Sequence, residues 1–418
     1  MTSPNPPRPL EREPADSPTA RPVAAGAPLA VRTLQKRLAA PGIPAFDLEL
    51  PDGAAHRLGG AGEPAFRLRL RTPAGLAALA SLDETRIGEA YMDGDLDLDG
   101  ELLAALELRA ALSDSHPLRS AWRFLQPLLF GRVRSDKRWV AQHYDYGNEL
   151  YFAFLDRDYR LYSQALYRSE ADTLDQAVRR KLEYIMRVGR LGPGAHVLDV
   201  GGGWGSLARY AGARGVNVTM LTISPEQYRY LTAWSGDHGL PCRLQAVYES
   251  IFAYAAPEQY DAITLLGVME HLPDYPALFK KFETLLRPHG RVYMDFAAGR
   301  EKFAVSSFTY RYVFPGAHTP VVLPDLLAAA NRTSFEPIAL HNDRHSYYLT
   351  LQAWARNLES AHDEVALRVG ERIYRLFRLY LWGGAWQFKR DGALESYRVV
   401  FQKSWGGPSS AIGLDQPS

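Results

Sequence analysis

The stretch AHVLDVGGGWGSLA, residues 195–208, joins a short apolar run, a cluster of glycines and the start of a helical pattern. Such an apolar run is typical of a buried parallel strand. Glycines let the backbone turn sharply and let a ligand come close to it. A strand, a loop and a helix in this order bind a nucleotide-like cofactor at the carboxyl end of the strand. The stretch therefore predicts a cofactor site.

The glycine spacing distinguishes between two classes of cofactor. Dinucleotide-binding folds usually carry G-x-G-x-x-G, with an acidic residue about 20 residues further on. Here the glycines are Gly201, Gly203 and Gly205. Asp199 precedes them, and the next predicted strand ends in TIS, residues 222–224. This pattern favours S-adenosylmethionine, and a glycine-rich turn without a ligand is the alternative.

The bulk composition limits the possible partners and compartments. The chain of 418 residues is long enough for two domains, and 46% hydrophobic residues suffice for a sizeable core. A net charge of +1 gives no electrostatic case for a nucleic-acid partner. The single cysteine, Cys242, fits a reducing compartment. Without a long apolar run or a signal-peptide pattern, we expect a cytoplasmic protein that can still work at a membrane surface.

Composition divides the chain into five parts. The N-terminal residues are rich in Pro, Ala, Ser and Arg without periodicity, which predicts disorder. A basic, aromatic segment separates two regions that carry strand and helix patterns. The predicted parts are a disordered tail (1–27), a small α+β domain (28–114), a basic aromatic linker (115–139), the main domain (140–405) and a flexible tail (406–418).

The small domain carries two alternating segments. Residues 46–50 and 66–70 alternate apolar and polar side chains, and residues 51–53 form a turn, so we expect two antiparallel strands. A helix should follow over residues 72–80. The acidic stretch 88–97 lacks the spacing of an EF-hand loop, so we expect a turn with solvated carboxylates and no metal site.

Two segments carry an unusual number of aromatic residues. The linker combines tryptophan and phenylalanine with six basic residues and one acid, Asp136, which suits an anionic lipid surface or an inter-domain helix. The tyrosines of residues 143–151 and 159–164 suit a lid over a cofactor or a domain surface.

The main domain alternates predicted strands and helices. Strands are expected at 196–200, 216–222, 242–246, 260–266 and 290–297, with helices at 173–188, 225–236 and 275–287. This repetition predicts an α/β fold with a doubly wound, mainly parallel sheet. The last third should add a strand within 331–341, an aromatic-rich helical cover at 346–384 and a closing strand at 397–401.

Three motifs in the main domain resemble those of a known family. They are VLDVGGGWG (197–205), TISPEQ (222–227) and GVMEH (267–271), accompanied by HYD (143–145) and YS (162–163). Together they look like the cyclopropane fatty acid synthases and their relatives, the mycolic acid methyltransferases. The resemblance covers about residues 139–403. Residues 88–94, GEAYMDG, look like the small lipid-facing domain of the bacterial members.

The resemblance implies a class I methyltransferase fold and transfer of a methyl group from S-adenosylmethionine to the double bond of an unsaturated acyl chain. The acyl chain would belong to a phospholipid at the inner face of the membrane. The cofactor-binding residues that the resemblance implies are Tyr162, Ser163, Asp199, Gly201, Gly203, Gly205, Thr222, Ser224, Gln227, Tyr248 and Glu249.

The resemblance also implies a proton-accepting site, where this chain departs from the family. Family members hold a bicarbonate base with a glutamate, a tyrosine, a histidine and a cysteine. Glu270 and Tyr347 match the first two, whereas Asp295 stands at the histidine position and Gln164 at the cysteine position. A further cysteine of the family corresponds to Gly384. A carboxylate at Asp295 would repel an anion beside Glu270, which disfavours bicarbonate.

We therefore hypothesise that Asp295 is itself the base, oriented by Gln164 and Tyr347. The alternative is a structural Asp295 with bicarbonate still bound. The altered base leaves a methylene-branched or a cyclopropane product open, and the former would need a separate reductase. A homodimer is compatible with the family. Two rival functions stay open, a methyltransferase of a small soluble molecule and a non-catalytic relative that binds lipid or cofactor.

Overall fold

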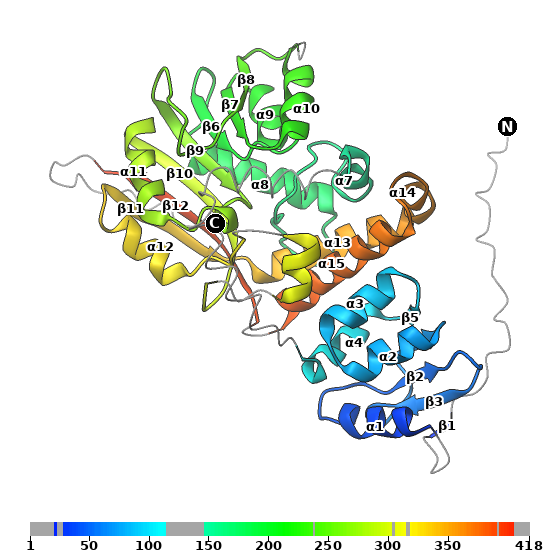
Figure 1. The fold of residues 1–418 in the computed structure, drawn as a ribbon. Coiled ribbons are helices and arrows are strands. Elements are labelled where there is room, and N and C mark those ends of the chain that lie inside the picture. Colours follow the sequence, from blue (N-terminus) through cyan, green and yellow to red (C-terminus); the bar gives the residue numbers. More distant parts are fainter. Residues whose placement is uncertain are drawn as a thin grey trace, which may run out of the picture. The chain divides into compact units, whose positions relative to one another are not determined.

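The computed structural model describes residues 21–22, 28–113, 146–236, 239–302, 306–314, 318–390 and 393–404. The chain divides into two compact units, Met1–Ser113 and Asp114–Ser418 (Figure 1). The predicted linker (115–139), the HYD motif (143–145) and most of both predicted tails lie outside the described residues.

The N-terminal unit contains a five-stranded sheet in the order β1-β3-β2-β4-β5. Its apolar strand faces and its helices share one core, which includes Val31, Leu48 and Leu68. The elements are β1 (Arg21–Pro22), α1 (Leu29–Leu38), β2 (Phe46–Glu49), β3 (Ala55–Leu58), β4 (Phe66–Leu70), α2 (Pro73–Ser81), α3 (Glu84–Met92), β5 (Leu96–Gly100), α4 (Leu102–Ala105) and a 3₁₀ helix (Leu106–Ala111).

One expectation for this unit is wrong, and a second is right only in part. The alternating strands β2 and β4 are parallel neighbours, because the turn at 51–53 returns the chain into β3, which pairs antiparallel with β2. The predicted turn at 88–97 is a turn only at residues 93–95, between the end of α3 and the start of β5. Asp95 accepts a hydrogen bond from Thr72, the N-cap of α2 (2.6 Å), and Asp97 pairs with Arg71 (2.7 Å), so these two carboxylates have protein partners, whereas Asp93 is exposed as expected.

The second unit is built on a seven-stranded sheet in the order β11-β12-β10-β9-β6-β7-β8. The strands from β10 to β8 are parallel, and β12 runs antiparallel to both β10 and β11. This confirms the α/β, mainly parallel sheet. The strands are β6 (His196–Val200), β7 (Asn217–Thr222), β8 (Leu244–Tyr248), β9 (Tyr260–Leu266), β10 (Leu286–Ala298), β11 (Phe335–Asn342) and β12 (Glu395–Lys403).

Helices cover both faces of this sheet, which explains why β6 is buried along its whole length. One face packs with Leu182 of α8 and Leu207 of α9. The other packs with Phe279 of α11 and Leu326 of α12. The helices are α7 (Asn148–Phe154), α8 (Leu174–Val188), α9 (Ser206–Gly212), α10 (Pro225–Ser235), α11 (Tyr275–Leu285), α12 (Leu323–Ala330), a 3₁₀ helix (Met269–His271) and a π-helix (Thr309–Val313).

The predicted helical cover at 346–384 is confirmed and consists of three helices. They are α13 (Arg344–Ser360), α14 (His362–Val369) and α15 (Glu371–Lys389). Gly370 ends α14 with φ +83°, a left-handed conformation that breaks the helix. α13 and α15 pack against each other (Figure 1). Of the helices in the described ranges, none combines the length and apolar content that crossing a membrane requires.

Candidate active site

The glycine loop, residues 201–205, joins β6 to α9. Gly201, Gly203 and Gly205 have φ values of +78°, +54° and +82°, which L side chains rarely adopt. A Cβ at Gly201 would lie 2.4 Å from the Cγ2 atom of Val268, so packing as well as φ excludes a side chain there. A Cβ at Gly203 would meet nothing closer than 3.8 Å. The loop therefore leaves open space above Gly203, as a cradle for S-adenosylmethionine requires.

Asp199 lies next to the end of β6 and is buried. Its Oδ1 atom accepts a hydrogen bond of 2.8 Å from the hydroxyl of Thr264 on the adjacent strand β9. Burial raises the pKa of the Asp199 carboxyl to about 6. The residue thus supports the strand that carries the glycine loop.

The TISPEQ motif forms a self-bonded turn between β7 and α10. The Thr222 hydroxyl donates to Gln227 Oε1 (2.9 Å), and the Ser224 backbone N–H donates to the Thr222 hydroxyl (3.1 Å). Ser224 Oγ accepts from the Gln227 backbone N–H (3.3 Å) and so caps α10. These bonds fix all three predicted residues and leave the amide nitrogen of Gln227 for a ligand.

Tyr248 and Glu249 lie at the carboxyl end of β8, the strand next to β7. Tyr248 is 37% exposed, and its ring centroid is 5.6 Å from that of Tyr228 on α10. Glu249 is half-buried. Both therefore lie at the same edge of the sheet as the TISPEQ turn.

An aromatic cluster surrounds Tyr162. Its ring centroid lies 5.3 Å from that of Trp354, 5.4 Å from Tyr151 and 6.0 Å from Trp204 of the glycine loop. The Tyr162 hydroxyl is 3.3 Å from that of Tyr380 on α15. The described part of the tyrosine-rich segments therefore packs beneath the helical cover, next to the glycine loop.

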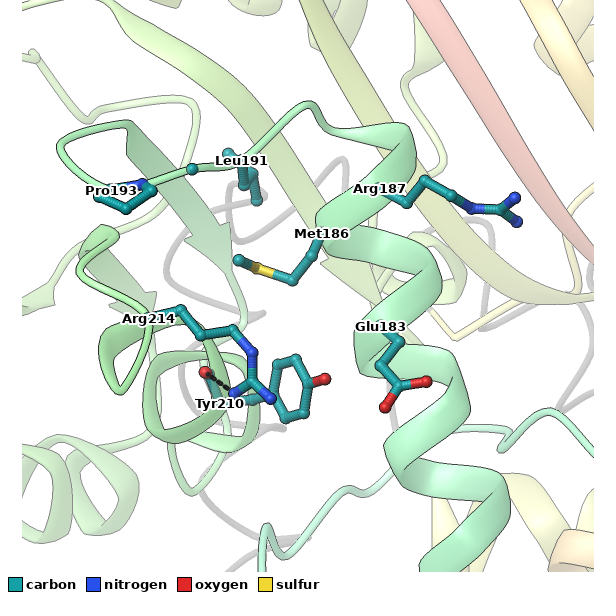
Figure 2. A pocket seen from close by; sticks show the side chains of 8 residues that line it. Glu183, Met186, Arg187, Leu191, Pro193, Tyr210 and Arg214 are labelled. Atoms are coloured by element: carbon teal, nitrogen blue, oxygen red, sulfur yellow. Dashed lines mark hydrogen bonds between the residues drawn. The ribbon is translucent and has the colours of Figure 1, made fainter. Parts of the chain in front are cut away.

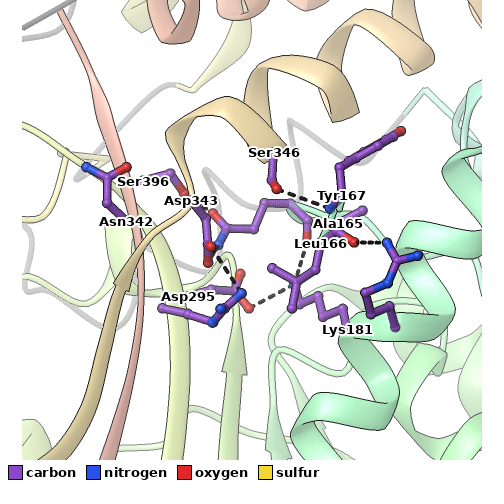
Figure 3. A network of polar contacts seen from close by, with 12 residues as sticks. Ala165, Leu166, Tyr167, Lys181, Asp295, Asn342, Asp343, Ser346 and Ser396 are labelled. Carbon is purple, nitrogen blue, oxygen red and sulfur yellow. Dashed lines mark hydrogen bonds and ion pairs between the residues drawn. The ribbon is translucent and has the colours of Figure 1, made fainter. Parts of the chain in front are cut away.

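Lys181 connects the YS motif to the sheet, and the motifs gave no sign of it. Its Nζ atom donates to the Ser163 hydroxyl (2.7 Å) and to the Gln164 carbonyl oxygen (2.8 Å). It also forms an ion pair of 2.8 Å with Asp295 of β10, and the two side chains are 0% and 1% exposed. Figure 3 shows Lys181 and Asp295 pointing toward each other. Burial lowers the pKa of Lys181 and raises that of Asp295, and each charge opposes the shift of the other.

The helical pattern of residues 174–188 could have indicated that Lys181 is buried. On α8 it lies on the buried face with Ala177, Val178, Leu182 and Ile185. A lysine on the apolar face of an amphipathic helix needs a buried anion. Asp295 supplies that anion.

The Gln164 side chain lies against Asp343 and Ser396 rather than against Asp295. Its Nε2 atom donates to Asp343 (3.1 Å), and the Ser396 hydroxyl donates to its Oε1 atom. Asp343 also pairs with Arg398 (3.0 Å), and burial raises the pKa of Asp343 to about 6. The hydrogen bonds of the Gln164 amide thus go to Asp343 and Ser396, and not to Asp295 as expected.

Tyr347, expected as the second residue to orient Asp295, lies in the first turns of α13. Its ring centroid is 4.4 Å from that of Phe388 on α15, and its backbone N–H donates to the Asp343 carbonyl. Gly384, on α15, lies against Leu351.

Glu270 lies in the 3₁₀ helix after β9 and is 5% exposed. Its Oε1 atom accepts from the backbone N–H of Ala297 (2.6 Å), two residues after Asp295 on β10. Its Oε2 atom is buried without a hydrogen-bond partner. Burial raises the pKa of Glu270 to about 7. Two buried carboxylates thus lie near the end of β10, and Lys181 pairs with Asp295.

An open pocket of about 450 Å³ lies at the other end of the sheet (Figure 2). Glu183 and Met186 of α8 line it together with Tyr210 of α9 and Pro193, which precedes β6. The glycine loop follows β6, so this pocket is separate from the candidate active site.

Comparisons with known proteins agree with this geometry. The family model described as mycolic acid cyclopropane synthetase matches residues 132–398, and a domain of unknown function matches residues 34–118. The chain is 30% identical over 347 residues to the cyclopropane-fatty-acyl-phospholipid synthase of Escherichia coli K12, covering 80% of this chain and 87% of that protein. It is 25% identical over 339 residues to a sphingolipid C9-methyltransferase of Komagataella phaffii, covering 76% and 69%.

A solved structure is also similar. The mycolic acid cyclopropane synthase CmaA1, complexed with SAH and CTAB, has a TM-score of 0.58 and 25% identity, over 64% of this chain and 98% of that chain.

Proposed function

The chain belongs to the mycolic acid cyclopropane synthetase family of S-adenosylmethionine-dependent methyltransferases, and we propose that its substrate is the double bond of an unsaturated acyl chain in a membrane phospholipid. The name of the Escherichia coli relative supports a phospholipid substrate, at 87% coverage of that protein. The observation that carries the proposal is the glycine loop beside a buried aromatic cluster, which suits a methyl donor and an apolar acceptor together.

The residues of the sheet edge fit the cofactor. Gly203 would let it approach the backbone closely, and the amide nitrogen of Gln227, in the first turn of α10, would donate to the ribose. Tyr248 and Glu249, at the end of the next strand, flank the adenine in this proposal. When bound, S-adenosylmethionine supplies an electrophilic methyl group, whose transfer to an alkene leaves positive charge on the acyl chain.

The aromatic cluster suits that positive charge. Faces of tyrosine and tryptophan attract a cation at close range, and their effect grows where water is excluded. Trp204 and Trp354 are each 1% exposed, and Tyr162 lies between them. In this proposal the cluster excludes water from the space next to the glycine loop and stabilises the positive charge on the acyl chain.

The final proton loss decides the product. If the new methyl group loses a proton while its carbon bonds to the cationic neighbour, a cyclopropane ring closes. If a hydride first moves the charge to the methyl-bearing carbon, the same loss leaves an exocyclic methylene. The altered residues Gln164 and Asp295 make the methylene product a contender, and a separate reductase would then act on it.

The lipid product tests this proposal. The chain is expressed in a bacterium that makes oleoyl or vaccenoyl phospholipids but lacks a cyclopropane synthase. Fatty acids one carbon heavier are separated by gas chromatography and identified by proton NMR, because the ring and methylene products have equal mass. Either species supports the proposal. No heavier fatty acid, from a protein that binds S-adenosylmethionine, would contradict it.

A further inference from the structure

The two buried carboxylates near the end of β10 differ in their partners. Asp295 Oδ2 is 2.8 Å from the Lys181 ammonium. Glu270 uses Oε1 for the Ala297 N–H and leaves Oε2 buried without a partner. A buried anionic oxygen without a partner is costly, so its affinity for a proton is high. An ammonium in contact instead stabilises the ionised form of a carboxylate.

The same residues do not suit an added bicarbonate. The buried network holds two cations, and each is already paired: Lys181 with Asp295 and Arg398 with Asp343. Glu270 and the nearby Asp199 add a third and a fourth carboxylate, so when all are ionised the network carries two negative charges in excess. Among the residues that the structure describes, a further anion beside Glu270 would therefore gain no unpaired cation from this network. The Gln164 amide is also committed, to Asp343 and Ser396.

We propose that Oε2 of Glu270 itself takes the proton released from the methylated acyl chain, without a bound anion. Asp295 does not take this proton, because Lys181 holds its carboxylate in an ion pair. This inference rests on the proposed function and deepens it. It replaces the hypothesis that Asp295 is the base, because that carboxylate has a counter-ion in contact, whereas no described residue forms an ion pair with Glu270.

The proposed step balances without a further reactant. A C–H bond of the cationic chain breaks, and its electron pair forms the new carbon–carbon bond of the ring or of the alkene. The proton bonds to Glu270 Oε2 and gives a neutral carboxylic acid. The positive charge of the chain and the negative charge of Glu270 vanish together. Glu270 returns its proton to water after the product leaves.

The matched variants are Glu270→Gln and, as control, Glu336→Gln. Glutamine keeps the shape of Glu270 and an oxygen for the Ala297 N–H, but it is no base. Glu336 is an exposed glutamate on β11, away from the network. With oleoyl phosphatidylglycerol vesicles, we expect Glu270→Gln to lower kcat by about 10²–10⁴-fold, and Glu336→Gln to change it less than about twofold. Affinity for S-adenosylmethionine, measured by calorimetry, should stay within about threefold in both.

A second measurement needs neither cofactor nor substrate. Infrared difference spectra of the unliganded protein against pH should show a buried carboxylic-acid band that disappears as pH rises through about 7. The component that disappears near pH 7 should be absent from Glu270→Gln and present in Glu336→Gln, while the bands of Asp199 and Asp343, whose pKa values are about 6, stay in both variants. A component near pH 7 that persists in Glu270→Gln and is lost in Asp295→Asn would overturn the inference.

Activity in carbon dioxide-free buffer separates the two proposals. We expect the wild type to keep its rate there and to gain less than about twofold from added bicarbonate. A rate that requires bicarbonate, or a fully active Glu270→Gln variant, overturns the inference while the proposed function stands. A wild type that makes no heavier acyl product defeats the proposed function, and the inference falls with it.

Discussion

The glycine loop and the buried polar network around Lys181 lie near the same end of the sheet, yet they are specified in opposite ways. The loop is one contiguous stretch whose work is done by backbone conformation and by the absence of side chains. The network joins Gln164, Lys181, Asp295, Asp343 and Arg398, which are far apart in sequence and meet only in the fold. A cofactor-binding loop can therefore be predicted from one stretch of sequence. Acid–base roles depend on which charged residues form ion pairs in the folded protein.

The largest effect we expect is on the network. Lys181→Met leaves Asp295 buried without a counter-ion and should cost about 3–5 kcal/mol of unfolding free energy. The double variant Lys181→Met/Asp295→Leu replaces the pair with apolar groups and should recover most of that loss. Arg179→Met, on the exposed face of the same helix, is the control and should change stability by less than about 0.5 kcal/mol. Urea unfolding measures the stability of all three variants. A double variant no more stable than Lys181→Met would contradict the ion pair between Lys181 and Asp295.

A smaller effect comes from Glu270 through pH. Its pKa is about 7 in the folded protein against 4.5 for the free side chain, so between these values the folded state holds a proton that the unfolded state has lost. The stabilisation is full below pH 4.5 and is lost as pH rises through about 7. At about 1.36 kcal/mol per pKa unit, the difference of about 2.5 between the two pKa values amounts to no more than about 3.4 kcal/mol. Comparing wild type with Glu270→Gln by urea unfolding at pH 5 and pH 8 isolates this term. An equal difference at both pH values would show that Glu270 is not shifted.

The smallest effects separate the glycines of the loop. Gly201→Ala meets both an unfavourable φ and Val268, and should cost about 1–3 kcal/mol of stability. Gly203→Ala meets open space, so only its backbone strain, about 1 kcal/mol, should appear in stability. Its cofactor affinity should fall at least about tenfold, because the methyl group enters the ligand's space. Thermal unfolding and calorimetry measure the two quantities, and unchanged affinity in Gly203→Ala would remove that glycine from the cradle.

The sequence predicted the elements whose signals are local. The apolar run at 260–266 is strand β9 with the same bounds, and the glycine stretch joins strand β6 to helix α9. The sequence did not reveal β3, because its few residues, AHRL, carry no clear alternation. It also gave the wrong direction to the pairing of β2 and β4, which depends on that missing strand.

For the candidate site, too, the sequence predicted single residues but not their partners. Glu270 and Asp295 stood out by motif and position, and both are buried at the carboxyl end of the sheet. Which of them is paired could not be foreseen, since Lys181 is 114 positions from Asp295 along the chain and meets it only when α8 packs on β10. The partners of Gln164 likewise come from β11–α13 and β12.

The most direct test of the account is the fate of a labelled methyl group. The purified protein is incubated with S-adenosylmethionine labelled with ¹³C at its methyl group and with vesicles of oleoyl phosphatidylglycerol. We predict that the label appears in the acyl chain, as a ring or methylene carbon in NMR spectra of the extracted lipid. Cofactor binding without label in the acyl chain of any unsaturated phospholipid would contradict the account.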